Sequence, residues 1–201
     1  MNKWTDRIET PIKAELICYD VNGIQIVFGV TEENELKLFH FSRAPFDAEN
    51  LCRKPDNWWP MEGMREAQIK ESFQLVQVNF SGYNRPYEKH GNKYIVTAPG
   101  FMLKFDSISE ERDENGDVLR IVQKDGVTGA KVESVMQFYD GLSIARMYNT
   151  VTNEGNEDQT LEYISSFSYW GIEKEQKEGI PEFISSDDKM SMVVVHNGWQ
   201  K

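Results

Sequence analysis

Carboxylates are the most abundant side chains in this chain that could do chemistry. The 201 residues include 33 Asp and Glu against 22 Lys and Arg. Glycoside hydrolysis by paired carboxylates needs two of them about 5 to 10 Å apart, and many folds with this many acids would bring two together. Asp106, Asp125 and Asp140 stand at predicted turns or strand ends, where Asp accepts backbone hydrogen bonds. Abundance alone therefore identifies no catalytic residue.

Histidines and cysteines are the next candidates, because they are the usual ligands of zinc and the usual nucleophile and base pair. His40, His90 and His196 lie far apart and outside any HExxH pattern. Cys18 and Cys52 form neither a CxxC pair nor a cluster with histidine. We therefore predict no metal site and interpret both cysteines as reduced thiols.

Tryptophans give the most specific hint of a binding surface. Trp58 and Trp59 are adjacent in a proline-flanked loop, and Trp199 follows His196 and Asn197 near the end of the chain. An indole face beside amide and imidazole groups suits the apolar face and hydroxyl rim of a sugar. The alternative interpretation is that these rings anchor loops onto the core or fill an interface.

Charge and motif content exclude several classes of function. The formal net charge is −11, which repels nucleic acid and anionic membrane surfaces. No GxxxxGK[ST] motif occurs and no GxGxxG follows a predicted strand, so we expect no nucleotide cofactor, and no other cofactor is indicated. The amino terminus lacks a basic region followed by an apolar run, which favours a cytoplasmic protein.

The sequence predicts that β-strands position the candidate carboxylate, histidine and tryptophan side chains. Short segments rich in Val, Ile, Phe and Tyr repeat with period two, as in half-buried strands. The pattern predicts strands at residues 14–19, 24–30, 35–41, 73–80, 94–98, 101–109, 118–124, 130–139, 142–152, 161–170 and 190–196. Helical patterns are limited to residues 64–71 and 173–177. This succession predicts an all-β fold, a large antiparallel β-sandwich forming one domain over residues 1–201.

Turn residues separate these strands at the expected places. Asn22-Gly23, Asn115-Gly116 and Asp140-Gly141 tolerate positive φ, as two-residue hairpin turns require. The hairpin at residues 131–152 is the best defined, since apolar residues flank one such turn. Two stretches lack this order: residues 43–72 are too long for an ordinary connection, and residues 173–189 are predominantly charged.

Residues 73–201 resemble the amino-terminal domain of family 36 glycoside hydrolases, the α-galactosidase type. The resemblance is collinear and includes the Leu119, Ile121 and Asp125 positions, followed by Thr128-Gly129 and Tyr139-Asp140. The matching segments are residues 73–78, 89–93, 98–103, 119–125, 128–129, 137–141, 151–155, 161–167 and 196–199. The first 72 residues match mainly through residues 24–40, and residues 43–63 depart from the family pattern.

The resemblance implies a supersandwich like that of galactose mutarotase, followed in the parent protein by a (β/α)8 barrel. In this family the barrel supplies both catalytic aspartates of a retaining, metal-free reaction on terminal α-galactosides. The chain is then expected to be an incomplete, non-catalytic sandwich that supports the barrel, the substrate entrance or a subunit interface of a homo-oligomer.

The same resemblance suggests which residues meet the galactoside. An early loop in this family reaches toward a neighbouring subunit's active site, which makes Arg43, Asp47, Trp58 and Trp59 candidates. Trp199 and the preceding Asn197 fall in a matched segment and are the stronger pair.

Two other functions remain open from the sequence. One is a free-standing carbohydrate-binding module of the same sandwich type. The other is a mutarotase-like enzyme, which needs a carboxylate base and a histidine acid converging in one cleft.

Overall fold

The computed structural model describes residues 1–9, 12–48, 51, 73–83 and 98–169 of the chain. The chain divides into two units, Met1–Trp170 and Gly171–Lys201, and the described residues all belong to the first. Within the described ranges, no helix has both the length and the apolar character needed to span a membrane.

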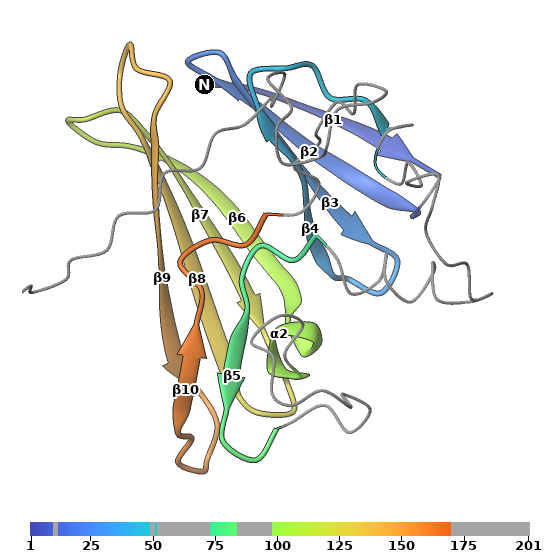
Figure 1. The fold of residues 1–201 in the computed structure, drawn as a ribbon, viewed down its shortest axis with the longest axis vertical. Coiled ribbons are helices and arrows are strands. Elements are labelled where there is room, and N and C mark those ends of the chain that lie inside the picture. Colours follow the sequence, from blue (N-terminus) through green and yellow to red (C-terminus); the bar gives the residue numbers. More distant parts are fainter. Residues whose placement is uncertain (10–11, 49–50, 52–72, 84–97, 170–201) are drawn as a thin grey trace, which may run out of the picture. The chain divides into compact units, whose positions relative to one another are not determined.

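The first sheet is a four-stranded antiparallel meander (Figure 1). Its strands, in sheet order, are β1 (Asn2–Ile8), β2 (Ala14–Val21), β3 (Ile24–Thr31) and β4 (Leu36–Ser42). Asn22 and Gly23 connect β2 to β3 with φ angles of 53° and 77°. These positive angles are those of the hairpin turn predicted from the Asn-Gly pair.

The second sheet is also a four-stranded antiparallel meander. Its strands, in sheet order, are β6 (Lys104–Arg112), β7 (Asp117–Lys124), β8 (Ala130–Phe138) and β9 (Ala145–Asn153). The predicted hairpin around Asp140-Gly141 is confirmed, because β8 and β9 pair without interruption from Ala130 opposite Asn153 to Phe138 opposite Ala145.

A smaller antiparallel pair and one short helix complete the described structure. β5 (Val78–Phe80) pairs with β10 (Leu161–Ile164), and α2 (Ala98–Met102) precedes β6. Beyond β10 the chain stays close to the segment before β5, since the Ser165 and Ser168 amides donate to the carbonyls of Gln77 and Leu75.

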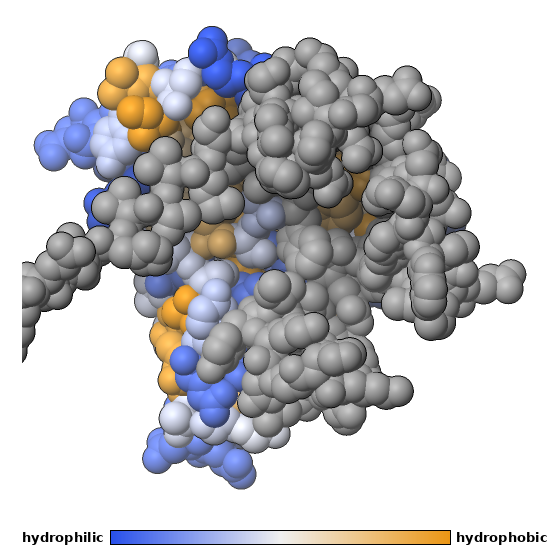
Figure 2. Space-filling model, viewed as in Figure 1, coloured by the Kyte–Doolittle hydropathy of each residue, from blue (hydrophilic) through white to orange (hydrophobic). Residues whose placement is uncertain are grey.

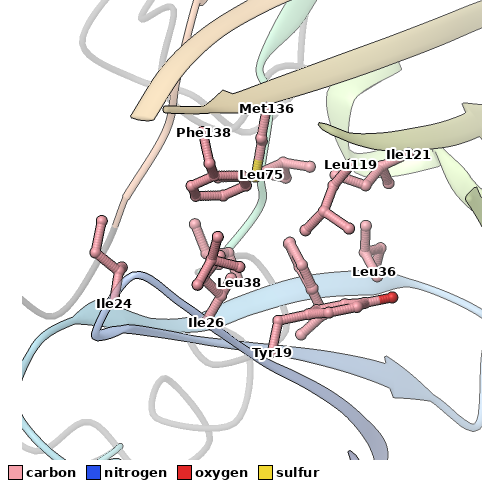
Figure 3. Close-up of a cluster of buried hydrophobic side chains, with 12 residues drawn as sticks. Tyr19, Ile24, Ile26, Leu36, Leu38, Leu75, Leu119, Ile121, Met136 and Phe138 are labelled. Carbon is pink, nitrogen blue, oxygen red and sulfur yellow. The ribbon is translucent and has the colours of Figure 1, made fainter. Parts of the chain in front are cut away.

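One apolar cluster joins the two large sheets (Figure 3). Tyr19, Ile26 and Leu38 from the first sheet meet Leu119 and Phe138 from the second, each no more than 1% exposed. Full burial of one such side chain contributes about 1.5 to 3 kcal/mol. Two packed antiparallel sheets around this cluster confirm the predicted all-β sandwich.

Two further clusters flank the central one. The other face of the first sheet buries Leu16, Cys18, Val27 and Phe39. The β5 strand covers part of the second sheet, where Val78 and Val132 are both fully buried. At the surface, large apolar side chains such as Leu142 and Ile144 are about half exposed, and the face drawn in Figure 2 mixes hydrophilic and hydrophobic groups.

Two turns of the first sheet are hydrogen-bonded to the second sheet. The Asn22 amide donates to the carbonyls of Tyr139 (2.7 Å) and Leu142 (3.1 Å) at the β8–β9 turn. In the β3–β4 turn, Asn34 makes two hydrogen bonds with Phe105 at the start of β6. The Asn34 side chain donates to the Phe105 carbonyl, and the Phe105 amide donates to the Asn34 carbonyl, both at 2.8 Å. The sandwich is therefore fastened by polar contacts in addition to its core.

We expect Asn22→Gly to destabilise the chain by about 2 kcal/mol, since glycine keeps the positive φ but loses two hydrogen bonds worth about 1 kcal/mol each. Asn22→Ala should cost about 1 kcal/mol more because a non-glycine residue without a local hydrogen bond is strained there. Urea unfolding measures both. Equal losses from the two variants would contradict this division between hydrogen bonds and backbone strain.

Several sequence predictions differ from the structure at their edges. The strand predicted at residues 73–80 is reduced to Val78–Phe80, apart from an isolated bridge between Gln74 and Lys37. The strand predicted at residues 101–109 begins at Lys104, after α2, and the one at residues 161–170 ends at Ile164. β1 was not predicted, because its exposed side chains show no apolar alternation.

Other predicted elements lie outside the described residues. These are the strand at residues 190–196, most of the strand at residues 94–98, both helices (64–71 and 173–177), the loop at residues 173–189 and most of the loop at residues 43–72. Residue 98, the last of the strand predicted at 94–98, is helical as the first residue of α2.

Candidate functional site

Of the six candidate substrate-contacting residues, the structure describes two. Arg43 and Asp47 lie in the irregular segment after β4, and both are exposed. Trp58, Trp59, Asn197 and Trp199 lie outside the described residues.

The segment that carries Arg43 and Asp47 is anchored on the first sheet. The Phe46 amide donates to the Gln25 side chain at 2.5 Å, and the Ala44 amide donates to Ser42 Oγ at 3.1 Å. Phe46 and Ala48 pack against the cluster on the outer face of the first sheet. Because the apolar residues hold the segment down, the two charged side chains remain available to solvent on either side of Phe46.

His40 belongs to this anchor. Its Nε2 lies 2.7 Å from the Ala44 carbonyl oxygen, which only accepts, so Nε2 carries the hydrogen and donates it. The ring lies 5.7 Å from that of Phe46. Burial lowers the pKa of His40 below its ordinary value, and the Ala44 carbonyl offsets part of that effect. At neutral pH His40 is therefore an uncharged residue that positions a loop.

Three acids that the sequence placed at turns have structural partners. Asp125 is buried in the β7–β8 turn, where it accepts from the Val127 amide (2.9 Å), the Thr128 amide (3.1 Å) and the Thr128 hydroxyl (2.6 Å). Asp140 pairs with Arg112, and Asp106 lies 3.5 Å from the Lys124 ammonium. The turn interpretation is confirmed for Asp125 and Asp140, whereas Asp106 is the third residue of β6 and lies inside that strand.

The Thr128-Gly129 pair of the family-like motif also has a structural explanation. The Ala130 amide donates to Thr128 Oγ1, which fixes the end of the same turn. Gly129 has a φ of 74°, and its carbonyl accepts from the Glu154 amide at 2.8 Å. The motif thus joins the β7–β8 turn to the segment that follows β9.

Cys18 behaves as a core residue. It is 1% exposed on the outer face of the first sheet, and burial, aided by the negative charge of Asp6, raises its pKa to about 11. A thiol with such a pKa stays protonated at neutral pH and is a poor nucleophile. The prediction of a reduced thiol holds for Cys18, whereas Cys52 lies outside the described residues.

A charged group missed by sequence reasoning lies where the β3–β4 turn meets β6. The Glu35 carboxylate lies 3.1 Å from the Lys37 ammonium and 3.2 Å from that of Lys104. The Lys37 side chain is 1% exposed, and burial lowers its pKa. Lys37 stands between Leu36 and Leu38 of the central cluster, so its place in the strand pattern is that of a solvent-facing residue and gives no signal of its burial. Within the described ranges, no cluster of His, Cys, Asp or Glu has the composition of a metal site.

Comparison with known proteins gives one structural similarity. No family model matches the chain, and no curated protein matches it. The fold is similar to part of the crystal structure of AgaB, a GH36 α-galactosidase from Geobacillus stearothermophilus, with 14% identity and a TM-score of 0.44. The alignment covers 79% of this chain and 24% of AgaB, so the chain spans well under half of that enzyme.

Proposed function

We propose that this chain is the amino-terminal sandwich domain of a retaining α-galactosidase, and that it supports catalysis without performing it. The proposal rests on the collinear sequence resemblance, whose segments coincide with structural elements. Residues 119–125 span β7 and its turn, residues 128–129 complete that turn, and residues 137–141 join β8 to the next turn. One sandwich thus accounts for the order and spacing of these segments.

The contacts of three acids, Asp106, Asp125 and Asp140, support a non-catalytic role for these residues. Asp125 is committed to turn amides, while Asp106 and Asp140 face Lys124 and Arg112. In the proposal, the reacting aspartates belong to a (β/α)8 barrel of the parent protein, which would be cytoplasmic and homo-oligomeric. Arg43, Asp47, Trp58, Trp59, Asn197 and Trp199 would line the substrate entrance.

The test compares two proteins on an aryl α-galactoside. We expect the 201-residue chain to release no phenol above the uncatalysed rate, whereas the full product of its reading frame should turn the substrate over. Turnover by the 201-residue chain would overturn the non-catalytic role. An inactive full product that lacks a barrel would overturn the assignment to an α-galactosidase.

A binding measurement separates this proposal from the free-standing carbohydrate-binding module. Calorimetric titration of the chain with an α-galactosyl oligosaccharide should show no saturable binding if the entrance is completed by the barrel. In the full product, Arg43→Ala or Asp47→Ala should raise KM, while Lys13→Ala, which changes an exposed lysine just before β2, should leave KM unchanged. Saturable binding by the chain, lost on Trp199→Ala, would favour the module instead.

A further inference from the structure

The β9 strand forms an edge of the second sheet (Figure 1). Its nine residues pair with β8 without a register shift, and none of the described strands pairs with its other side. Such an edge presents a row of backbone amides and carbonyls to which another strand can add. Proteins usually protect a long edge with charged side chains, a bulge or a proline.

The other edges of the described sheets have protections that β9 lacks. β6 combines a register shift with five charged side chains. β4 also has a register shift and is partly covered, since the Leu38 amide donates to the Phe73 carbonyl. β1 has three charged residues among seven, and β5 and β10 have only three and four residues. β9 carries one charged residue, Arg146, and no proline or glycine, so it is the described edge best suited to accept a strand.

Backbone hydrogen bonds at the end of β9 show which of its residues face outward. The Glu154 amide donates to the Gly129 carbonyl at 2.8 Å, one step beyond the last pair of the β8–β9 ladder. In an antiparallel ladder, residues that turn their amide and carbonyl toward the partner strand alternate with residues that turn them away. The amides and carbonyls directed away from β8 are therefore those of Ala145, Met147, Asn149, Val151 and Asn153.

Exposed apolar side chains gather near this edge. Tyr148 on β9 is 41% exposed, and Leu142 and Ile144, just before β9, are 51% and 53% exposed. They are three of the seven large apolar side chains that are exposed among the described residues. Contiguous exposed apolar groups mark interaction sites, whereas scattered ones need no explanation.

We propose that β9 pairs with β9 of a second copy of this chain, antiparallel about a two-fold axis at Asn149. This register opposes the two strands over their whole length. Met147 then meets Val151 of the second copy, and each such pair of outward-facing residues exchanges two backbone hydrogen bonds. The two copies use the same surface, as a two-fold dimer requires.

The side chains are complementary in this register. Tyr148 meets Thr150 of the second copy, and a pair of aromatic and β-branched residues stabilises antiparallel strands. Arg146 is opposite the uncharged Thr152 and diagonal to Glu154 of the second copy. No like charges are opposed along the strand.

The charge of the whole chain also favours contact at β9. The formal net charge of −11 makes two copies repel each other over most of their surface. β9 itself carries a single positive charge, with an acid at position 154 just beyond its far end. This edge is therefore a favourable place for two acidic copies to meet.

The pairing extends the proposed function, because it gives the expected homo-oligomer a defined contact surface. It rests on the geometry of β9 and not on the assignment to an α-galactosidase. Since dimerisation of the 201-residue chain is measured without any galactoside, either proposal can fail while the other stands.

The first experiment measures the dissociation constant of the dimer by sedimentation equilibrium. We expect the unmodified chain to dimerise and Thr150→Lys to raise the dissociation constant by about tenfold or more, because the new ammonium lies diagonal to Arg146 of the second copy. Within its own chain the new side chain faces Glu133, so the fold is retained. Thr152→Glu should lower the dissociation constant, because its carboxylate lies opposite Arg146 of the second copy.

Thr5→Lys is the matched control. It makes the same change at an exposed position of β1, the edge of the other large sheet, and should leave the dissociation constant unchanged. A monomeric unmodified chain would overturn the proposal. So would equal dissociation constants for the Thr150→Lys and Thr5→Lys variants.

Residue-resolved hydrogen exchange of the unmodified chain tests the register and needs no variant to fold. The outward-facing amides of Met147, Asn149 and Val151 should exchange slowly in the dimer and rapidly after dilution to the monomer. The amides of Tyr148 and Thr150 face β8 and should be protected in both. Rapid exchange of the outward-facing amides in the dimer would place the interface elsewhere and overturn the proposal. Protection at every concentration would show that the same chain occupies the edge, which would also overturn it.

Discussion

Gly129→Ala is expected to destabilise the chain by roughly 3 to 5 kcal/mol. Two costs add. The φ of 74° is strained for any residue with a side chain, at about 1 to 3 kcal/mol. An added Cβ would also lie 2.5 Å from both Cα and N of Gly155, and this backbone cannot move aside as a side-chain tip could. Overpacking of this kind costs about 1 to 3 kcal/mol more.

The same turn supplies the control. Gly126 lies three residues earlier, and a Cβ there would meet no atom within 4 Å. We expect Gly126→Ala to change the free energy of unfolding by less than about 1 kcal/mol, with a slight gain from reduced freedom of the unfolded chain. Urea unfolding of both variants gives the comparison. Similar midpoints for the two would show that the contact between the Gly129 and Gly155 turns is not rigid.

Glu35→Gln is expected to cost several kcal/mol, because it removes the carboxylate that lies 3.1 Å from the buried Lys37 ammonium. Breaking a buried ion pair by removing one partner typically costs about 3 to 5 kcal/mol. The control is Lys104→Met, which removes the other partner of Glu35. That side chain is 44% exposed, so its loss should cost less than about 1 kcal/mol.

The pH dependence of this variant gives a second readout. Burial already lowers the pKa of Lys37 from 10.5, and loss of the Glu35 charge should lower it further. A lysine whose pKa is lower in the folded state binds fewer protons there than in the unfolded state, so stability rises with pH across that interval. The gap between Glu35→Gln and the unmodified chain should therefore shrink toward pH 10.5. A gap independent of pH would contradict a charge effect.

The fold was predictable from the sequence where alternation and turn chemistry agreed. β2, β3, β7 and β8 carry regular apolar positions, and each is bounded by a turn rich in Asn, Asp or Gly. The sequence pattern did not predict β1, because this strand is stabilised by pairing with β2 rather than by burial. Six of its seven residues are exposed. The sequence pattern did not predict α2 either, because a single turn containing Pro99 and Gly100 has no helical signal and depends on tertiary packing.

The candidate site was predictable to a smaller extent. Sequence reasoning placed Asp125 in a turn because Asp favours such positions, and the turn amides bear this out. It could not foresee that Lys37 is buried beside Glu35, or that Gln123 and Asn149 face the core, because these depend on register between strands. Polar residues at inward positions carry the same local pattern as solvent-facing ones.

The hydrogen bonds that join Asn22 and Asn34 to the second sheet have a consequence for the order of folding. These contacts join residues 117 and 71 positions apart in the chain, whereas every strand pair of the second sheet joins neighbours in sequence. Long loops must close before distant contacts contribute, so such contacts form late. Asn22→Gly should therefore accelerate unfolding and leave the refolding rate nearly unchanged in stopped-flow measurements. These hydrogen bonds would then slow the unfolding of the sandwich without contributing to the speed of its assembly.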